Sequence, residues 1–259
     1  MRCTTPRRSL LTRSTTATLT VLCSTLHLPA LAQVSSADTN SGSTPSREFT
    51  INDGSAHYSA KLYVSHCDAE ECQGEGRIQL FDKANQRFVQ TFSSDNLNFF
   101  LTAEQQPTVN VIQLYNEQSP LIFEDFNFDG SEDLAIRNGN NSGYGGPSYD
   151  VYVFNQSRRQ FVPSKELTAL AYENLGMFQT DAVRKRLTVF AKSGCCWHQT
   201  TEYAVVPKRG LVATKILTED AASADGRYVY VTTETRSNGV NGKMVGKTKK
   251  YKMADYYPD

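Results

Sequence analysis

The amino-acid sequence predicts an all-β protein of antiparallel strands, and three observations lead to that prediction. Apolar residues occupy alternate positions through residues 57–64, a period of two that is typical of a half-buried strand. Turn-forming Gly, Asn, Asp and Pro residues recur about every 8 to 12 residues beyond this segment. Only residues 165–174 have a helical pattern, with Ser164 as the expected N-cap. These features favour a small propeller-like, barrel or sandwich domain.

The remaining strands are expected between successive turn signals. The last hairpin is the clearest, because Asn238-Gly239 and Asn241-Gly242 suit the positive φ angles of tight turns. Its return strand carries Lys247, Lys249, Lys250 and Lys252, which are more typical of an edge strand that resists aggregation than of an anion-binding surface. The expected strands are residues 77–81, 88–92, 109–115, 121–125, 134–137, 149–155, 186–191, 202–206, 211–217, 227–235 and 243–252.

Residues 1–32 resemble a signal peptide rather than a folded segment. Four arginines and no acid precede or flank the apolar residues 17–28, which are too short to span a bilayer, and small residues lead up to Ala32. We expect cleavage after Ala32 and export to the periplasm. A lipid anchor at Cys23 is less favoured, because Leu22 stands where a small residue is normally needed. Residues 33–48 are polar and predict a disordered linker, so residues 49–259 form the expected β-rich domain.

Charge excludes one class of partner. Without the four arginines of residues 1–32, the chain has 23 basic residues against 27 acidic ones, a net charge of −4. Binding to nucleic acid normally requires a clustered basic face on a basic domain. We therefore expect no nucleic-acid partner.

Four cysteines lie beyond the signal segment, and cysteines of an exported chain usually form disulfides. Cys67 and Cys72 enclose a short polar segment, so a local bridge is favoured. Cys195 and Cys196 are adjacent and could either pair with each other or cross-link to the first two. The spacing C-x-x-C or H-x-x-x-H, which would favour zinc, does not occur around them.

Residues 125–133, DFNFDGSED, contain oxygen side chains at alternate positions followed by Gly130, where a sharp turn is needed. Calcium prefers six or more hard oxygen ligands, and the pattern D-x-N-x-D-G supplies them at positions 1, 3 and 5. Position 12, a glutamate in an EF-hand, is Ile136, and both flanks resemble strands. The loop is therefore similar to calcium turns within β-hairpins; the alternative is a solvated acidic turn. The expected ligands are Asp125, Asn127, Asp129, Ser131 through its carbonyl, and Asp133.

Residues 139–147 form a glycine-rich loop around a single aromatic residue, Tyr144. An exposed tyrosine presents a flat apolar ring and a hydroxyl at modest entropic cost, so it suits insertion into a partner's cleft. The alternative is a tyrosine that folds back onto its own sheet. The expected partner-binding residues are Ser142, Gly143, Tyr144 and Gly145.

The segment 124–154, together with the KSGCCWH run of residues 192–198 and the following Glu202-Tyr203, resembles the periplasmic immunity proteins of bacterium-killing type IV secretion systems. Those proteins are similar in turn to bacterial inhibitors of lysozymes. The resemblance implies a β-rich protein without enzymatic activity that binds calcium and inserts a tyrosine-bearing loop into a peptidoglycan hydrolase. Asp125, Asn127, Asp129 and Asp133 would then hold the ion, and Tyr144 would be the inserted residue.

Catalytic motifs are weak in this chain. Ser142 does not lie in a G-x-S-x-G motif, and no histidine has an obvious acidic partner in the sequence. An enzyme is therefore not expected. The main alternative is a calcium-dependent glycan-binding or adhesion module, in which Tyr144, Tyr149 and Trp197 would stack on sugars.

Overall fold

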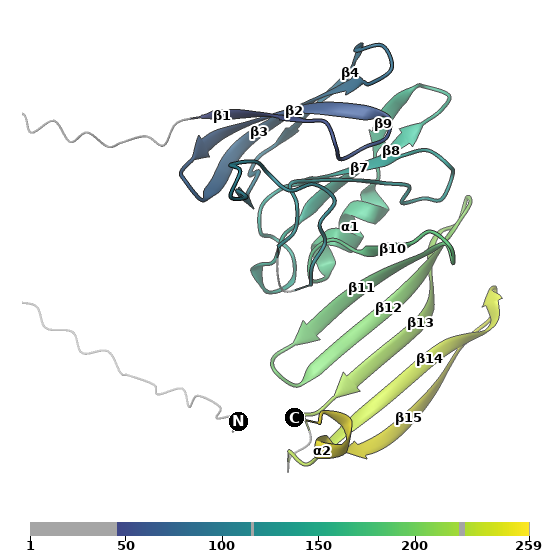
Figure 1. Ribbon diagram of the computed structural model, residues 1–259. Coiled ribbons are helices and arrows are strands. Elements are labelled where there is room, and N and C mark those ends of the chain that lie inside the picture. Colours follow the sequence, from purple (N-terminus) through teal and green to yellow (C-terminus); the bar gives the residue numbers. More distant parts are fainter. Residues whose placement is uncertain (1–45, 115–116, 223–225, 259) are drawn as a thin grey trace, which may run out of the picture. The chain divides into compact units, whose positions relative to one another are not determined.

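A computed structural model describes residues 46–114, 117–222 and 226–258, which belong to one compact unit, Gly42–Asp259. The predicted signal peptide, Cys23 and residues 33–45 of the predicted linker lie outside these residues. The described strands form three antiparallel sheets, in which strands adjacent in sequence are mostly adjacent in the sheet (Figure 1). The prediction of an all-β fold is confirmed. Within the described ranges, no helix has the length and apolar character needed to cross a membrane.

The first sheet has the order β1-β2-β3-β4, with the short β5 paired to β3. At the end of the β2–β3 hairpin, Cys67 lies opposite Cys72 and the two form a disulfide, which confirms the predicted local bridge. Strand β1 starts at Arg47, inside the segment predicted as linker, because residues 47 and 48 pair with Val64 and Tyr63 of β2. The strands are β1 (Arg47–Ile51), β2 (Tyr58–Cys67), β3 (Glu71–Asp82), β4 (Phe88–Ser94) and β5 (Phe99–Phe100).

The second and third sheets are simple meanders. The second has the order β6-β7-β8-β9 and the third the order β10 to β15. Strand β15 is the last strand of the third sheet, as its lysines predict. The second sheet contains β6 (Leu121–Glu124), β7 (Asp133–Arg137), β8 (Tyr149–Asn155) and β9 (Gln160–Pro163). The third contains β10 (Gln179–Asp181), β11 (Arg186–Ser193), β12 (Trp197–Val206), β13 (Gly210–Asp220), β14 (Tyr228–Val240) and β15 (Met244–Lys252).

Strands β6 and β7 form a layer with an apolar core on each side. Leu121 and Phe123 belong to the core shared with the first sheet, whereas Ile122 between them belongs to a second core. This division follows from the geometry of a strand, in which successive side chains point to opposite faces. Each fully buried Leu, Ile or Phe in these cores contributes about 1.5–3 kcal/mol. The first and second sheets therefore pack as a sandwich.

The second core is closed by a helix and by the third sheet. Helix α1 (Lys165–Glu173) starts after Ser164, whose hydroxyl accepts a hydrogen bond from the Leu167 N–H at 3.4 Å, as the predicted N-cap requires. Its apolar side packs in this core together with Leu187 and Val189 of β11. A second short helix, α2 (Met253–Tyr256), follows β15.

The strand predicted at residues 109–115 is wrong for its described part. Only isolated bridges form there, between Val109 and Leu121 and between Ile112 and Gln118. Asn110 adopts a positive φ of 60°, and its amide side chain bonds to the Gly54 carbonyl at 2.6 Å and to the Phe123 N–H at 2.7 Å. These contacts to distant segments hold the chain in an irregular path instead of a ladder.

Candidate functional site

The acidic turn between β6 and β7 is held by its own side chains. The Asp125 carboxylate accepts hydrogen bonds from the N–H groups of Asp129 at 3.1 Å and Gly130 at 2.8 Å. Asn127 accepts a second bond from the Asp129 N–H at 2.9 Å. Gly130 has a φ of 91°, which only glycine adopts readily. The predicted ligand positions 1, 3 and 5 therefore lie on one tight turn.

Asp133 lies at the base of this turn as the first residue of β7 and is 0% exposed. One carboxylate oxygen accepts from the Phe126 N–H at 3.0 Å and the Asn127 N–H at 3.3 Å, and the other from the Phe154 N–H at 2.8 Å. Burial raises the pKa of Asp133 to about 7, although the hydrogen bonds from the backbone lower the pKa. The nearby carboxylates of Asp129 and Asp125 raise the pKa further. The turn thus concentrates negative charge around one buried acid.

The donor set of the turn suits a hard cation. Its side chains offer oxygen atoms and no nitrogen or sulfur ligand that would favour a softer metal. Asp129 also accepts from the Ser131 N–H at 2.8 Å, which ties the fifth and seventh positions together. Among the residues that the structure describes, no three His, Cys, Asp or Glu side chains form a group with metal-binding geometry. Asp133 directs both oxygens at backbone amides and thereby holds the shape of the turn.

Two phenylalanines between the predicted ligands anchor the turn. Phe126 is fully buried in the second core and meets Phe178 edge-on, with ring centroids 5.3 Å apart. Phe128 is partly buried against the same core. Both therefore pack toward the second core.

The tyrosine loop is also fixed at its base. The Gly143 N–H donates to the Asn174 carbonyl at 2.7 Å, and a Cβ at position 143 would lie 3.0 Å from that oxygen. The backbone closes on itself where the Ser142 N–H donates to the Gly146 carbonyl at 3.2 Å. Tyr144 at the tip adopts φ 59° and ψ 28°, a left-handed conformation that is rare for a bulky residue. The loop is a short, constrained turn.

The Tyr144 side chain lies against the turn between β11 and β12 while leaving most of its surface open. It is 63% exposed, and its hydroxyl accepts a hydrogen bond from the Gly194 N–H. The Lys192 ammonium lies 4.7 Å from the ring centroid, within the range of a cation–π contact. A pocket of about 440 Å³ adjoins the ring, lined by Gln118, Gly143, Tyr144, Gly146, Pro147, Leu175 and Lys192. The fold thus brings together the segments 124–154 and 192–198, on which the resemblance to the immunity proteins rests.

Buried polar residues support the loop from below. Arg137, at the end of β7, donates to the Gln118 carbonyl at 3.1 Å and to the side chains of Asn98 at 3.1 Å and Asn140 at 2.6 Å. Burial lowers the pKa of Arg137. All five residues of β7 are buried, so this strand is a rigid connection between the acidic turn and the tyrosine loop. Neither Arg137 nor Lys192 belonged to the predicted site, because most of the groups that they contact are remote in sequence.

Other predicted functional residues are placed differently. Tyr149 is 0% exposed and donates from its hydroxyl to the Ser119 carbonyl at 2.8 Å, so it cannot stack on a sugar as the glycan-binding alternative requires. Ser142 is 8% exposed, so it offers little surface to a partner. Cys195 and Cys196 pair with each other, one of the two arrangements that the sequence left open. This pair directly follows Gly194, the partner of Tyr144.

No protein-family model matches this chain, and no curated protein matches it. A solved structure, described as that of a Xanthomonas type IV secretion system related protein, has a similar fold. The two chains are 20% identical, the alignment covers 78% of this chain and 93% of the other, and the TM-score is 0.55. At this identity, the likeness is one of fold.

Proposed function

We propose that this protein is a periplasmic immunity protein, associated with a type IV secretion system, that inhibits a peptidoglycan hydrolase by inserting Tyr144 into its active-site cleft. The observation that carries the proposal is the tip of the tyrosine loop. A tyrosine that is 63% exposed is held in a left-handed conformation between two anchored turns. The similar fold of the Xanthomonas protein related to such a secretion system supports it.

The chemistry of the tip suits the cleft of a glycosidase. Such enzymes place two carboxyl groups on either side of the scissile bond, at least one of them ionised. A phenol can donate a hydrogen bond to a carboxylate, while the Lys192 ammonium beside the ring adds a positive charge that complements an acidic cleft. The constrained backbone lowers the entropy cost of binding, because little further ordering is needed. Inhibition on this basis requires no catalytic group in this chain.

We also propose that the acidic turn binds calcium. The ligands would be the side chains of Asp125, Asn127 and Asp129 and the carbonyl of Ser131, with Asp133 acting directly or through water. The bound ion would neutralise the carboxylates that surround the turn. Since β7 links the turn to the tyrosine loop, calcium would stiffen the support of Tyr144 without touching the partner.

The inhibition is tested with lysozyme-like peptidoglycan hydrolases and purified peptidoglycan. A buried tyrosine anchor at an interface is typically worth about 2 kcal/mol or more, so Tyr144→Ala should weaken inhibition by about thirtyfold. Tyr230→Ala is the matched control, because Tyr230 is also exposed, at 39%, but lies on β14. Equal inhibition by the wild type and Tyr144→Ala would refute the role of the loop. Binding to peptidoglycan alone, with the hydrolase still active, would instead favour the glycan-binding alternative.

Calcium binding is tested by titration calorimetry on protein stripped with a chelator. We expect saturable binding in the wild type, and a loss of binding in Asp125→Asn together with Asp129→Asn. The control is Asp181→Asn, because Asp181 is an acidic residue at the end of another strand, β10. No heat of binding at millimolar calcium would overturn this part of the proposal while leaving the inhibition test unaffected.

A further inference from the structure

The hairpin formed by β14 and β15 is positively charged, although the chain beyond residue 32 has a net negative charge. Residues 227–252 contain seven basic residues and one acid, Glu234. The rest of the chain beyond residue 32 has 16 basic residues against 26 acidic ones, so opposite charges are segregated along the chain. Five of the basic residues are the lysines of β15 and the residue before it: Lys243, Lys247, Lys249, Lys250 and Lys252.

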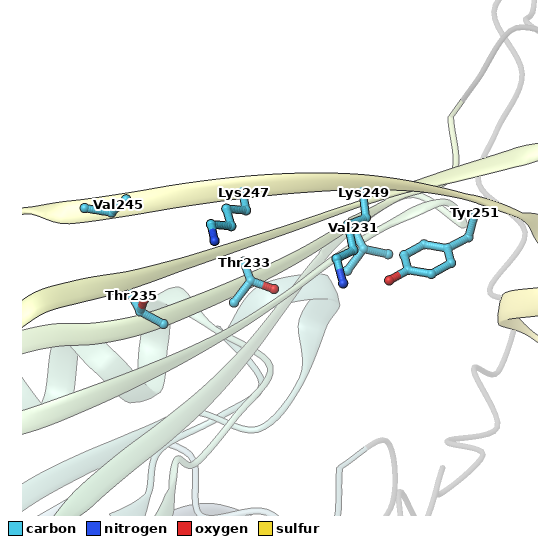
Figure 2. Close-up of a pocket in the computed structure, with 7 residues that line it drawn as sticks. All are labelled: Val231, Thr233, Thr235, Val245, Lys247, Lys249 and Tyr251. Atoms are coloured by element: carbon cyan, nitrogen blue, oxygen red, sulfur yellow. The ribbon is translucent and has the colours of Figure 1, made fainter.

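The side chains of these lysines point out from both faces of the edge strand. Lys247 lies opposite Thr233, and Lys249 opposite Val231, on one face of the hairpin. Figure 2 shows both lysine side chains on the same side of β15 as Tyr251, with Lys247 above Thr233 and Lys249 beside Val231. A groove of about 370 Å³ runs along this face, and no acidic residue lines it. Lys250 and Lys252 occupy the alternate positions of the strand, so their side chains point out from the opposite face.

Two carboxylates lie close to this hairpin in the strand pairing, and neither lines the groove. Glu219, opposite Val231 on β13, accepts a hydrogen bond from the Tyr257 hydroxyl at 3.4 Å. Glu234 lies opposite Gly246, on the face away from the two lysines of the groove. Within residues 46–114, 117–222 and 226–258, no salt bridge involves Lys247 or Lys249. The groove itself therefore presents ammonium groups with hydroxyls beside them, while Glu219 lies on the same face two strands away from Lys249.

Exposed apolar and aromatic groups accompany the lysines. Val245 is 50% exposed, Tyr257 44% and Tyr230 39%. The Lys250 ammonium lies 3.7 Å from the centroid of the Tyr228 ring. Lysine can bury its apolar stem while its charge stays in water. Together with tyrosine, it suits the interface between lipid headgroups and water.

We propose that the β14–β15 hairpin docks edge-on to the anionic phospholipid headgroups of a membrane. A sheet edge that meets a flat surface brings the side chains of both faces to that surface at once, which fits lysines on both faces better than a single cleft in a partner protein would. Anionic headgroups supply the complementary charge. Edge lysines also prevent strands from pairing, but that role does not account for the tyrosines and valine exposed beside them. The proposal is independent of hydrolase inhibition.

The test is flotation with lipid vesicles, using the protein as the cell processes it. Vesicles of phosphatidylcholine are compared with vesicles of phosphatidylcholine and phosphatidylglycerol in equal amounts. We expect binding to the anionic vesicles at about 0.1 M salt and release at about 1 M, where the screening length is about 3 Å. Lys247→Gln with Lys249→Gln should lower the partition coefficient by about thirtyfold, because each lysine near such a surface is worth about 1 kcal/mol.

A matched control variant separates this site from general charge. Lys165→Gln with Lys208→Gln removes the same charge from two exposed lysines, on α1 and in the turn after β12, and should bind like the wild type. Both variants should keep the unfolding midpoint of the wild type, since they alter exposed side chains only. Equal binding to neutral and anionic vesicles, no binding to either, or equal losses in the two variants would overturn the proposal. In the second case, the lysines would serve to keep β15 from pairing.

Discussion

Replacing Asp133 with asparagine tests how the fold tolerates a buried carboxylate at the base of the acidic turn. The side chain is 0% exposed, and its two oxygens accept hydrogen bonds from three backbone N–H groups. Burial nevertheless outweighs these bonds and raises the pKa of Asp133 from 3.8 to about 7. Asparagine has nearly the same shape and does not titrate, but its NH2 group cannot accept the hydrogen bond that one carboxylate oxygen accepts. That loss is the same at every pH, so the pH dependence of the difference between the two proteins reports the contribution of the charge.

The sign of the pH effect follows from proton linkage. In the calcium-free protein between about pH 5 and pH 7, the folded chain keeps the proton on Asp133 while the unfolded chain has released it. The free energy of unfolding therefore falls as the pH rises through this window. For a folded-state pKa of about 7, the loss between about pH 5 and pH 8 is about 3 kcal/mol. Asp133→Asn lacks this contribution, and the carboxyl groups that do not interact with Asp133 cancel in the difference between the two proteins.

The assay is urea unfolding of both proteins in chelator, followed by circular dichroism across this pH range. The difference in unfolding free energy should shift by about 3 kcal/mol in favour of the variant as the pH rises. A difference that stays constant with pH would refute the reasoning. It would mean that the N–H groups of Phe126, Asn127 and Phe154 keep the carboxylate ionised despite its burial.

Three further substitutions test the scaffold. Tyr149→Phe removes the hydroxyl that donates to the buried Ser119 carbonyl and should lower the free energy of unfolding by about 1–3 kcal/mol; the exposed Tyr257→Phe should change it by less than about 0.5 kcal/mol. Replacing Cys67 and Cys72 together with alanine opens a loop of sequence separation 5 and should lower unfolding free energy by about 2 kcal/mol, whereas unchanged stability under reducing and oxidising conditions would contradict the disulfide. Gly143→Ala brings a Cβ to 3.0 Å from the Asn174 carbonyl and should weaken hydrolase inhibition while leaving calcium titration unchanged; full inhibition would show that the base of the loop yields easily.

Elements that depend on local chemistry were predictable from the sequence. The strand expected at residues 149–155 has those bounds in the structure, because it is rich in valine and aromatic residues and is bounded by turn-forming residues. Helix α1 begins directly after its predicted N-cap, Ser164, because capping is settled within one turn. The same reasoning failed at residues 109–115. There the amide of Asn110 bonds to Gly54 and Phe123, and neighbours that distant leave no local pattern.

The sequence by itself determined the composition of the two candidate sites: oxygen side chains at alternate positions of a turn, and one tyrosine among glycines. Spacing along the chain specifies such features, and they remain predictions of calcium binding and partner binding. Only the tertiary structure decided that Asp133 is fully buried and that Tyr144 lies beside Lys192 and Gly194. Burial and the bond between residues 144 and 194, which are 50 positions apart, arise when sheets and loops pack together. Local residue preferences contain no information about that packing.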